Sequence, residues 1–149
     1  MGLDFSGFYL KKGETLRDLF ELPYNEYNLR ELFYARKGWE LVYALNCDTN
    51  NTCESKLRLE DWINLMEILS PMAPYFDEIY AAYETDDDSE RGRKLRKVYE
   101  DWHDTNFRVS PQLGYEFSIG YMQEFWEAGD KVLRYLEDPD YEVWMVASY

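Results

Sequence analysis

Both ends of the chain have the pattern of β-strands, and this constrains the fold more than any other feature of the sequence. The segment 4–10, DFSGFYL, is rich in aromatic residues and is followed by Lys-Lys-Gly. The segment 141–149, YEVWMVASY, alternates and places Tyr141, Val143, Met145 and Ala147 on one face. Because a buried strand must pair its backbone with a neighbour, we expect the two chain ends to form one small sheet.

Apolar residues recur at helical spacing between these two strands, and the pattern predicts about five helices. The main helical segments are 27–45, 59–69, 76–83 and 95–102, with a weaker one at 14–27. Pro74 is tolerated at the start of the third of these helices, and the composition of CDTNNTCES at 47–55 indicates a loop.

The last third of the sequence has a strand–helix–strand appearance. GYEFSI at 114–119 alternates like a strand, and Ser118 is placed to cap the helix that follows. A helix between two strands commonly makes a right-handed crossover between parallel strands. The length of 149 residues fits one domain. We therefore predict a single α+β domain over residues 1–149, with about five helices packed on a small sheet formed by the chain termini.

The chain is strongly acidic, with 30 acidic and 16 basic residues and a net charge of −14. Phosphate backbones and anionic membrane surfaces attract Lys and Arg, so direct binding to nucleic acid or to a membrane is not expected. A protein with a basic surface is a better partner, although an acidic surface can also serve solubility alone. No long apolar run predicts a membrane span, and the first residues lack a signal-peptide pattern. We expect a cytoplasmic protein.

Negative charge is concentrated in residues 47–83 and in the C-terminal third. Residues 98–149 hold 11 acidic and 3 basic residues together with many aromatic rings, and Tyr and Trp are enriched at binding hot spots. The predicted partner-binding residues are Glu116, Glu124, Trp126, Glu127, Asp130, Tyr135, Glu137, Asp138 and Asp140.

Several motifs that could carry other chemistry are better explained by structural roles. The stretch ETDDDSERGRKLRK at 84–97 lacks the spacing of a calcium loop and is read as the start of a helix, capped by Asp88 or Ser89 and supported by a Glu90–Lys94 pair. Cys47 and Cys53 are read as free thiols, although a small disulfide loop is geometrically possible. His103 is read as a histidine at the end of a helix. No catalytic residue, metal site or cofactor is predicted.

Three stretches together resemble a group of small, uncharacterised phage and prophage proteins. They are MGLD at the start, ELFYARKGWELV at 31–42, and the ending from LGYEFSI at 113–119 to residue 149. Proteins of that group open Met-Gly-Leu-Asp-Met-Tyr, carry a Tyr-Trp-Arg-Lys helix and close with an aromatic strand. Tyr34, Arg36 and Lys37 match the helix motif, whereas Ala35 and the segment 72–108 depart from it. The resemblance implies an accessory protein of a phage or mobile element and brings no established activity.

Two classes of function follow from these observations. The first is a protein that binds a basic surface of a host protein, such as an inhibitor that mimics nucleic-acid charge against a defence nuclease. The second is a small enzyme with a pocket of aromatic and carboxylate side chains, in which Glu124 and Glu127 would do acid–base work. A homo-oligomeric structural or regulatory protein is a third possibility.

Overall fold

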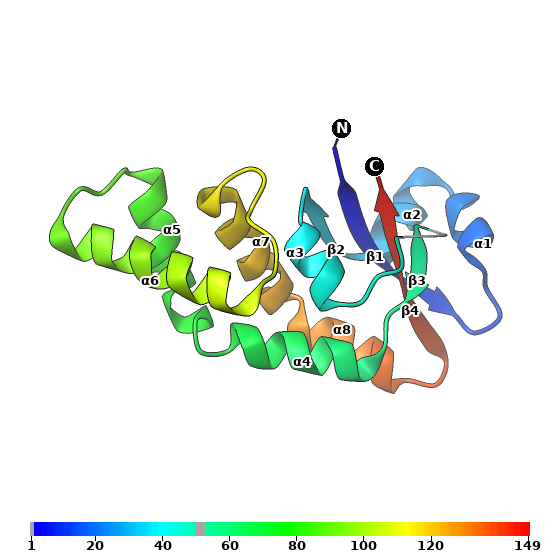
Figure 1. Ribbon diagram of the computed structural model, residues 1–149. Coiled ribbons are helices and arrows are strands. Elements are labelled where there is room, and N and C mark those ends of the chain that lie inside the picture. The colour runs from blue at the N-terminus through cyan, green and yellow to red at the C-terminus, as the bar shows by residue number, and fades with distance from the viewer. Residues whose placement is uncertain (1, 50–52) are drawn as a thin grey trace.

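The computed structural model describes residues 2–49 and 53–149 of the chain. Its centre is an antiparallel sheet with the strand order β2–β1–β4–β3. The strands are β1 (Asp4–Lys11), β2 (Glu31–Arg36), β3 (Glu54–Lys56) and β4 (Tyr141–Ser148). β1 and β4 pair along their whole length, from Asp4 opposite Ser148 to Lys11 opposite Tyr141. The chain ends therefore form the middle of the sheet, which confirms the prediction (Figure 1).

Eight α-helices lie along the part of the chain that the structure describes. They are α1 (Leu16–Phe20), α2 (Tyr24–Arg30), α3 (Trp39–Ala44), α4 (Leu59–Leu69), α5 (Phe76–Glu84), α6 (Glu90–Asn106), α7 (Tyr115–Glu127) and α8 (Gly129–Glu137), with the 3₁₀ turn η1 (Ala73–Tyr75) before α5. The α+β class is confirmed, and α4 has the predicted bounds. The helices outnumber the expected five because two predicted helical segments, 27–45 and the one after Ser118, each contain two shorter helices.

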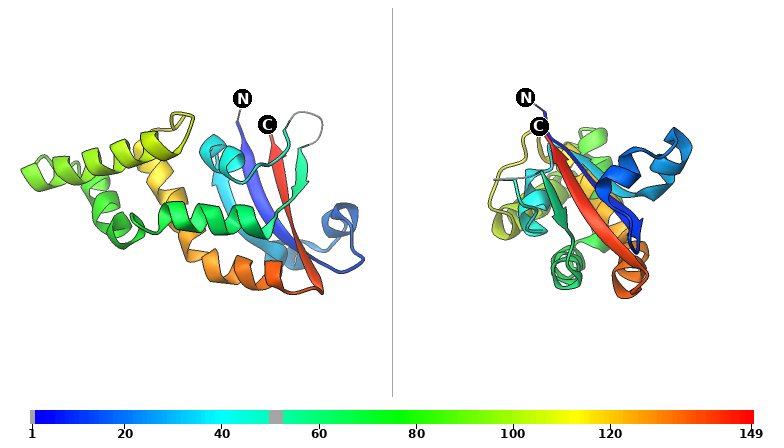
Figure 2. Two further views of the ribbon diagram at one scale, coloured as in Figure 1. Left: turned by 60° about the horizontal axis from the view of Figure 1, so that its bottom comes forward. Right: turned by 90° about the vertical axis from the view of Figure 1, so that its right-hand side faces the viewer.

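Helices cover both faces of the sheet (Figure 2). On one face, Phe8 and Leu10 of β1 form a small core with Leu16 and Leu19 of α1. The opposite face belongs to the main core, in which residues of β1, β2 and β4 pack against α4, α7 and α8. The residues of that face with no exposed surface include Phe5, Ala35, Val143, Ala147, Trp62 and Phe125.

The predicted helix at 27–45 is wrong, because the chain forms α2, β2 and α3 there. Glu31–Arg36 pairs with β1, with Ala35 opposite Phe5 and Phe33 opposite Gly7. Lys37 then takes a positive φ of 53° and Gly38 caps α3, so the backbone turns between strand and helix. Tyr34 and Arg36, which were placed on a helix by the resemblance, lie on a strand.

The predicted strand at 114–119 and the parallel crossover are also wrong. Gly114 has a φ of 90° and is the N-cap of α7, so Ser118 lies within the helix instead of capping it. The alternation of rings in GYEFSI reflects two faces of a helix, since Phe117 is exposed and Ile119 is buried. Conversely, β3 lies in the predicted loop at 47–55, of which residues 50–52 lie outside the described residues.

The helices α5 and α6 form a hairpin that extends away from the sheet (Figure 1). Ser89 caps α6 by accepting a hydrogen bond from the Gly92 backbone N–H at 3.1 Å, which confirms one of the two predicted caps. Tyr99 is fully buried between the hairpin and α7, but Val98 is 51% exposed. The predicted core stripe at 95–102 therefore divides between the core and the surface.

Gly7 lies where the register between β1 and β2 shifts, and a Cβ atom added there would lie 2.1 Å from the Phe33 ring. Phe33 cannot move aside easily, because its ring is stacked on Trp62 and contacts Phe125. We predict that Gly7→Ala lowers the free energy of unfolding by about 1–3 kcal/mol through overpacking. Urea denaturation would measure this, with Gly2→Ala as the control because no atom lies within 4 Å of that position. Equal midpoints for the two variants would contradict the packing described here.

Candidate functional site

An open groove of about 580 Å³ lies between α4 and the junction of α7 and α8. Its lining from α4 and the residue after it consists of Trp62, Ile63, Met66, Glu67 and Ser70, and its lining from α7 and α8 consists of Trp126, Glu127, Gly129, Asp130 and Leu133. We call this feature the acidic groove. The helices α4 and α8, which contribute to its lining, lie beside each other (Figure 2).

Gly129 lies where α8 meets α4. The Trp62 indole N–H donates a hydrogen bond of 3.0 Å to the Gly129 carbonyl oxygen. A Cβ atom on Gly129 would lie 2.8 Å from the Met66 sulfur, so a larger residue there would displace the Met66 side chain. The break between α7 and α8, at Ala128 and Gly129, thus gives the groove its floor.

The groove offers exposed apolar surface beside its buried floor. Trp62 has no exposed surface, whereas Trp126 and Ile63 are 37% and 40% exposed. A partly exposed tryptophan can pack against an apolar side chain and can also bind a cation over its ring. The surface therefore suits a ligand that is both apolar and positively charged.

The carboxylates around the groove lack compensating charges. Within the described part of the chain, Glu67, Glu127 and Asp130 form no ion pair, although many other acidic residues do. Glu124 lies one turn before Glu127 on α7, and burial together with the Glu127 carboxylate raises its pKa. Like charges are thus held close together without a cation between them, and a bound cation would relieve this repulsion.

The structure brings together only part of the predicted partner-binding set. Trp126, Glu127 and Asp130 line the acidic groove, and Glu124 adjoins it. Glu116 is at the opposite end of α7, about 16 Å from Glu127 at 1.5 Å per helical residue.

The remaining predicted residues lie at the far end of α8 and the turn into β4. Tyr135 stacks on the Tyr9 ring with centroids 4.3 Å apart, and it also meets Tyr141 edge-on. Its neighbours Glu137, Asp138 and Asp140 follow at the end of α8 and in the turn. The Asp138 side chain accepts the Asp140 backbone N–H, so it holds this turn.

Sequence reasoning missed the contribution of α4 to the groove. Ile63 and Glu67 lie four residues apart on one side of α4, a side that the core stripe of Trp62, Leu65 and Leu69 leaves exposed. The sequence signal for this surface is Ile63, a large apolar residue that lies outside the core stripe of the helix. Nothing local indicates that it faces α8, because that contact joins segments 67 residues apart.

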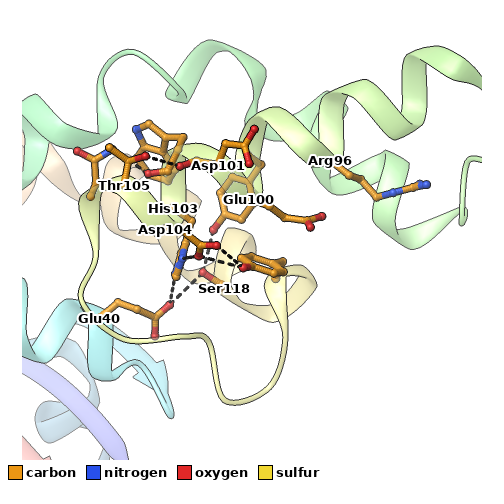
Figure 3. A network of polar contacts seen from close by, with 12 residues as sticks. Glu40, Arg96, Glu100, Asp101, His103, Asp104, Thr105 and Ser118 are labelled. Carbon is orange, nitrogen blue, oxygen red and sulfur yellow. Dashed lines mark hydrogen bonds and ion pairs between the residues drawn. The ribbon is translucent and has the colours of Figure 1, made fainter.

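His103 is the centre of a second polar cluster, shown in Figure 3. It lies in the last turn of α6, as predicted, and it is fully buried. Its Nε2 lies 2.9 Å from Glu40 Oε2, and its Nδ1 lies 3.1 Å from Asp104 Oδ1. Burial alone would lower the pKa of His103, but the hydrogen bonds to Glu40 and Asp104 outweigh burial and raise it. His103 therefore forms a buried ion pair with Glu40 that joins α6 to α3.

Ser118 completes this cluster from α7. Its hydroxyl donates to Glu40 Oε2 at 3.1 Å and lies 2.8 Å from the Tyr99 hydroxyl. A serine nucleophile needs a histidine base within hydrogen-bond reach, but Ser118 and His103 both bond to the same Glu40 oxygen. The arrangement thus connects α3, α6 and α7 and does not have the order of a catalytic triad.

Two of the acidic residues at 86–88 also have structural partners. Asp87 accepts the Ser89 backbone N–H, and Asp88 pairs with Arg93. Across residues 2–49 and 53–149, no group of three His, Cys, Asp or Glu side chains is placed to hold a metal ion. Cys47 is a buried free thiol and Cys53 an exposed one, as predicted.

None of the helices in the described residues is long and apolar enough to cross a membrane. No protein family matches the chain, and no curated protein or solved structure is similar to it.

His103 is the single histidine of the chain, so its imidazole protons can be followed directly by NMR. We predict that it titrates above its ordinary pKa of 6.5 and that Asp104→Asn lowers this pKa, because Asp104 is one of its two carboxylate partners. A histidine whose pKa is higher in the folded than in the unfolded state contributes its full stabilisation below the unfolded-state pKa. The free energy of unfolding should therefore fall as pH rises from about 6.5 through the folded-state pKa of His103. A titration at or below 6.5 would contradict the ion pair.

Glu124 should cost stability at neutral pH, because its folded-state pKa is raised. A raised carboxyl pKa means that the folded state loses stability as pH rises through the ordinary value. We predict that Glu124→Gln raises the melting temperature at pH 7, by an amount equivalent to at most about 0.5 kcal/mol, and that the difference vanishes near pH 3. Glu137→Gln, whose carboxylate lies away from this cluster, serves as the control.

Proposed function

We propose that this protein acts by binding another protein, and that the acidic groove is its binding surface. The partner is a basic surface of a host protein that handles nucleic acid, such as a defence nuclease. By occupying that surface the protein would exclude the nucleic acid and inhibit the enzyme. The suggestion that the protein belongs to a phage or mobile element rests on the sequence resemblance alone.

The observation that carries this proposal is the set of unpaired carboxylates around an exposed tryptophan. Free carboxylates at Glu67, Glu127 and Asp130 surround Trp126 and an apolar floor. Residues three or four apart on a helix lie about 5–6 Å from one another, so Glu124 and Glu127 present successive negative charges as a row of phosphates does. The aromatic floor adds contact area of the kind found at binding hot spots.

The opposite charge of the partner explains why the groove can remain unpaired in the free protein. Complementary fields accelerate encounter and discriminate against wrong partners. Desolvation of the carboxylates on binding is offset only when the partner supplies donors to them. Arginine is the best-suited residue, because its planar guanidinium forms bidentate bonds with carboxylates and also stacks on an indole ring.

The test uses bacterial nucleic-acid-binding proteins retained on DNA-cellulose at about 50 mM salt. The protein should release a specific subset of them by competing with DNA, and the competition should weaken steeply with salt, since it depends on charge. The variant Trp126→Ala should need about 30-fold more protein for the same release, as expected for a hot-spot tryptophan worth about 2 kcal/mol.

A matched pair of variants separates the groove from net charge. Glu67→Gln with Glu127→Gln and Asp130→Asn removes three charges from the groove, whereas Glu137→Gln with Asp138→Asn and Asp140→Asn removes three from the turn before β4. We expect the first set to abolish release and the second to change it little. Equal losses in the two sets would mean that the overall charge acts and that the groove is not the binding surface.

A further inference from the structure

A second groove lies on the outer side of the α5–α6 hairpin, away from the acidic groove. It has a volume of about 510 Å³ and is lined by Tyr75, Ile79, Glu90, Arg91, Lys94, Leu95 and Val98. Its apolar surface is accessible, because Tyr75 is 52% and Val98 51% exposed. We call it the hairpin groove.

The side of α6 that faces this groove is a distinct helical stripe. Arg91, Lys94, Leu95 and Val98 follow the spacing i, i+3, i+4 and i+7, which places them on one side of a helix. The buried residues Tyr99 and His103 lie on another side of α6. The helix thus has a stripe of two basic and two apolar residues that the fold of the single chain leaves partly uncovered.

The first part of α6 gathers the basic residues of the hairpin. Residues 84–97 contain five acidic and five basic residues, although α5, α6 and the turn between them together carry ten acidic and five basic ones. Arg91 pairs with Glu78, Arg93 with Asp88 and Lys97 with Asp101, while Arg96 donates to the carbonyl oxygens of Ala82 and Asp87.

Two charges of opposite sign remain on the rim of the hairpin groove. Glu90 and Lys94 form no ion pair with any described residue, so the predicted Glu90–Lys94 pair is absent from the described structure. These two charges lie four residues apart on α6. In a two-fold symmetric pair the same surface of each copy faces the other, so the acid of one copy can meet the base of its partner.

We propose that the hairpin groove binds the same groove of a second copy of this chain, with Glu90 of each copy facing Lys94 of the other. Two copies that each carry a charge of −14 repel one another over most of their surfaces, and they can approach at the hairpin groove, whose lining holds Glu90 together with Arg91 and Lys94. A strongly basic partner is disfavoured at this groove, because Arg91 and Lys94 would repel its positive charges. The inference does not depend on the proposed function, because it concerns the protein alone.

The interface predicted in this way is small. The helix α6 has 17 residues, a length of about 25 Å, so two crossed hairpins bury an area at the low end for specific interfaces. We therefore expect a dimer that dissociates on dilution, with a dissociation constant of about 1–100 μM. Sedimentation equilibrium of the wild-type protein between about 1 μM and 1 mM should show the average mass rising from one chain to two.

Charge reversal provides the decisive arms of the test. Glu90→Lys or Lys94→Glu alone should weaken self-association at least tenfold, because each places like charges across the two-fold axis. The double variant carrying both changes should restore it, and an equimolar mixture of the two single variants should form a mixed dimer. Val98→Asp should abolish the dimer while leaving the circular dichroism spectrum unchanged, since the side chain is half exposed. Glu137→Lys, with the same change in net charge as Glu90→Lys, is the control and should retain the dimer.

Two results would overturn the inference. One is a wild-type protein that stays monomeric up to 1 mM, which would leave the hairpin groove to a different protein or to solvent. The other is a dimer that survives both Val98→Asp and the single charge reversals, which would place the interface elsewhere. Both results are obtained without any partner, so they are distinct from failure of the acidic groove to bind one.

Discussion

The pairing of β1 with β4 is the constraint on which the rest of the structure depends. These strands lie at the two ends of the chain and pair over eight residues, and β2 and β3 then add to their outer edges. Because contacts between distant segments must overcome loop-closure entropy before they stabilise the fold, the sheet cannot be completed until β4 is available. The chain must therefore leave the sheet after each strand and return to it until β4 completes it, and the helices lie in these excursions.

The same constraint explains why the α5–α6 hairpin projects from the body. The two faces of the sheet are already covered by the helices α1, α2, α4, α7 and α8. The hairpin is attached to α7 and α3 instead, by the packing of Tyr99 and the buried bonds among Glu40, His103 and Ser118. Breaking a buried ion pair on one side typically costs about 3–5 kcal/mol. This cluster therefore fixes the orientation of an element that the sheet does not hold directly.

The sequence predicted the elements whose local pattern agrees with their tertiary surroundings. α4 and β4 have a single consistent periodicity, and both were placed correctly. β2 was read as part of a helix because ELFYAR also fits helical spacing, and only its pairing with β1 decides between the two. At Tyr115–Glu127 the error was the reverse, since Gly114 can begin a helix or end a turn and the packing of Ile119 against the core selects the helix.

The candidate site was predictable to the extent that it lies on one continuous segment. Composition alone identifies Trp126, Glu127 and Asp130, but they form a groove only because the fold brings the start of α8 against α4, where Trp62 bonds to the Gly129 carbonyl oxygen. Glu116 and Tyr135 shared that composition and lie elsewhere, because helix direction and the break at Ala128 separate them. Sequence patterns thus revealed which charges and rings are available, and the distances between them required the fold.

The two proposed surfaces would be linked by charge if both bind as described. Self-association through the hairpin is opposed by repulsion between two chains of net charge −14. A basic partner in the acidic groove neutralises part of that charge, so it lowers the repulsion and favours the dimer, and linkage requires that the dimer in turn bind the partner more tightly. A dimer also presents two acidic grooves, and a partner with two basic sites within reach of both would bind the second as an intramolecular event. Weak contacts at each surface can therefore combine into tight binding without a large interface at either one.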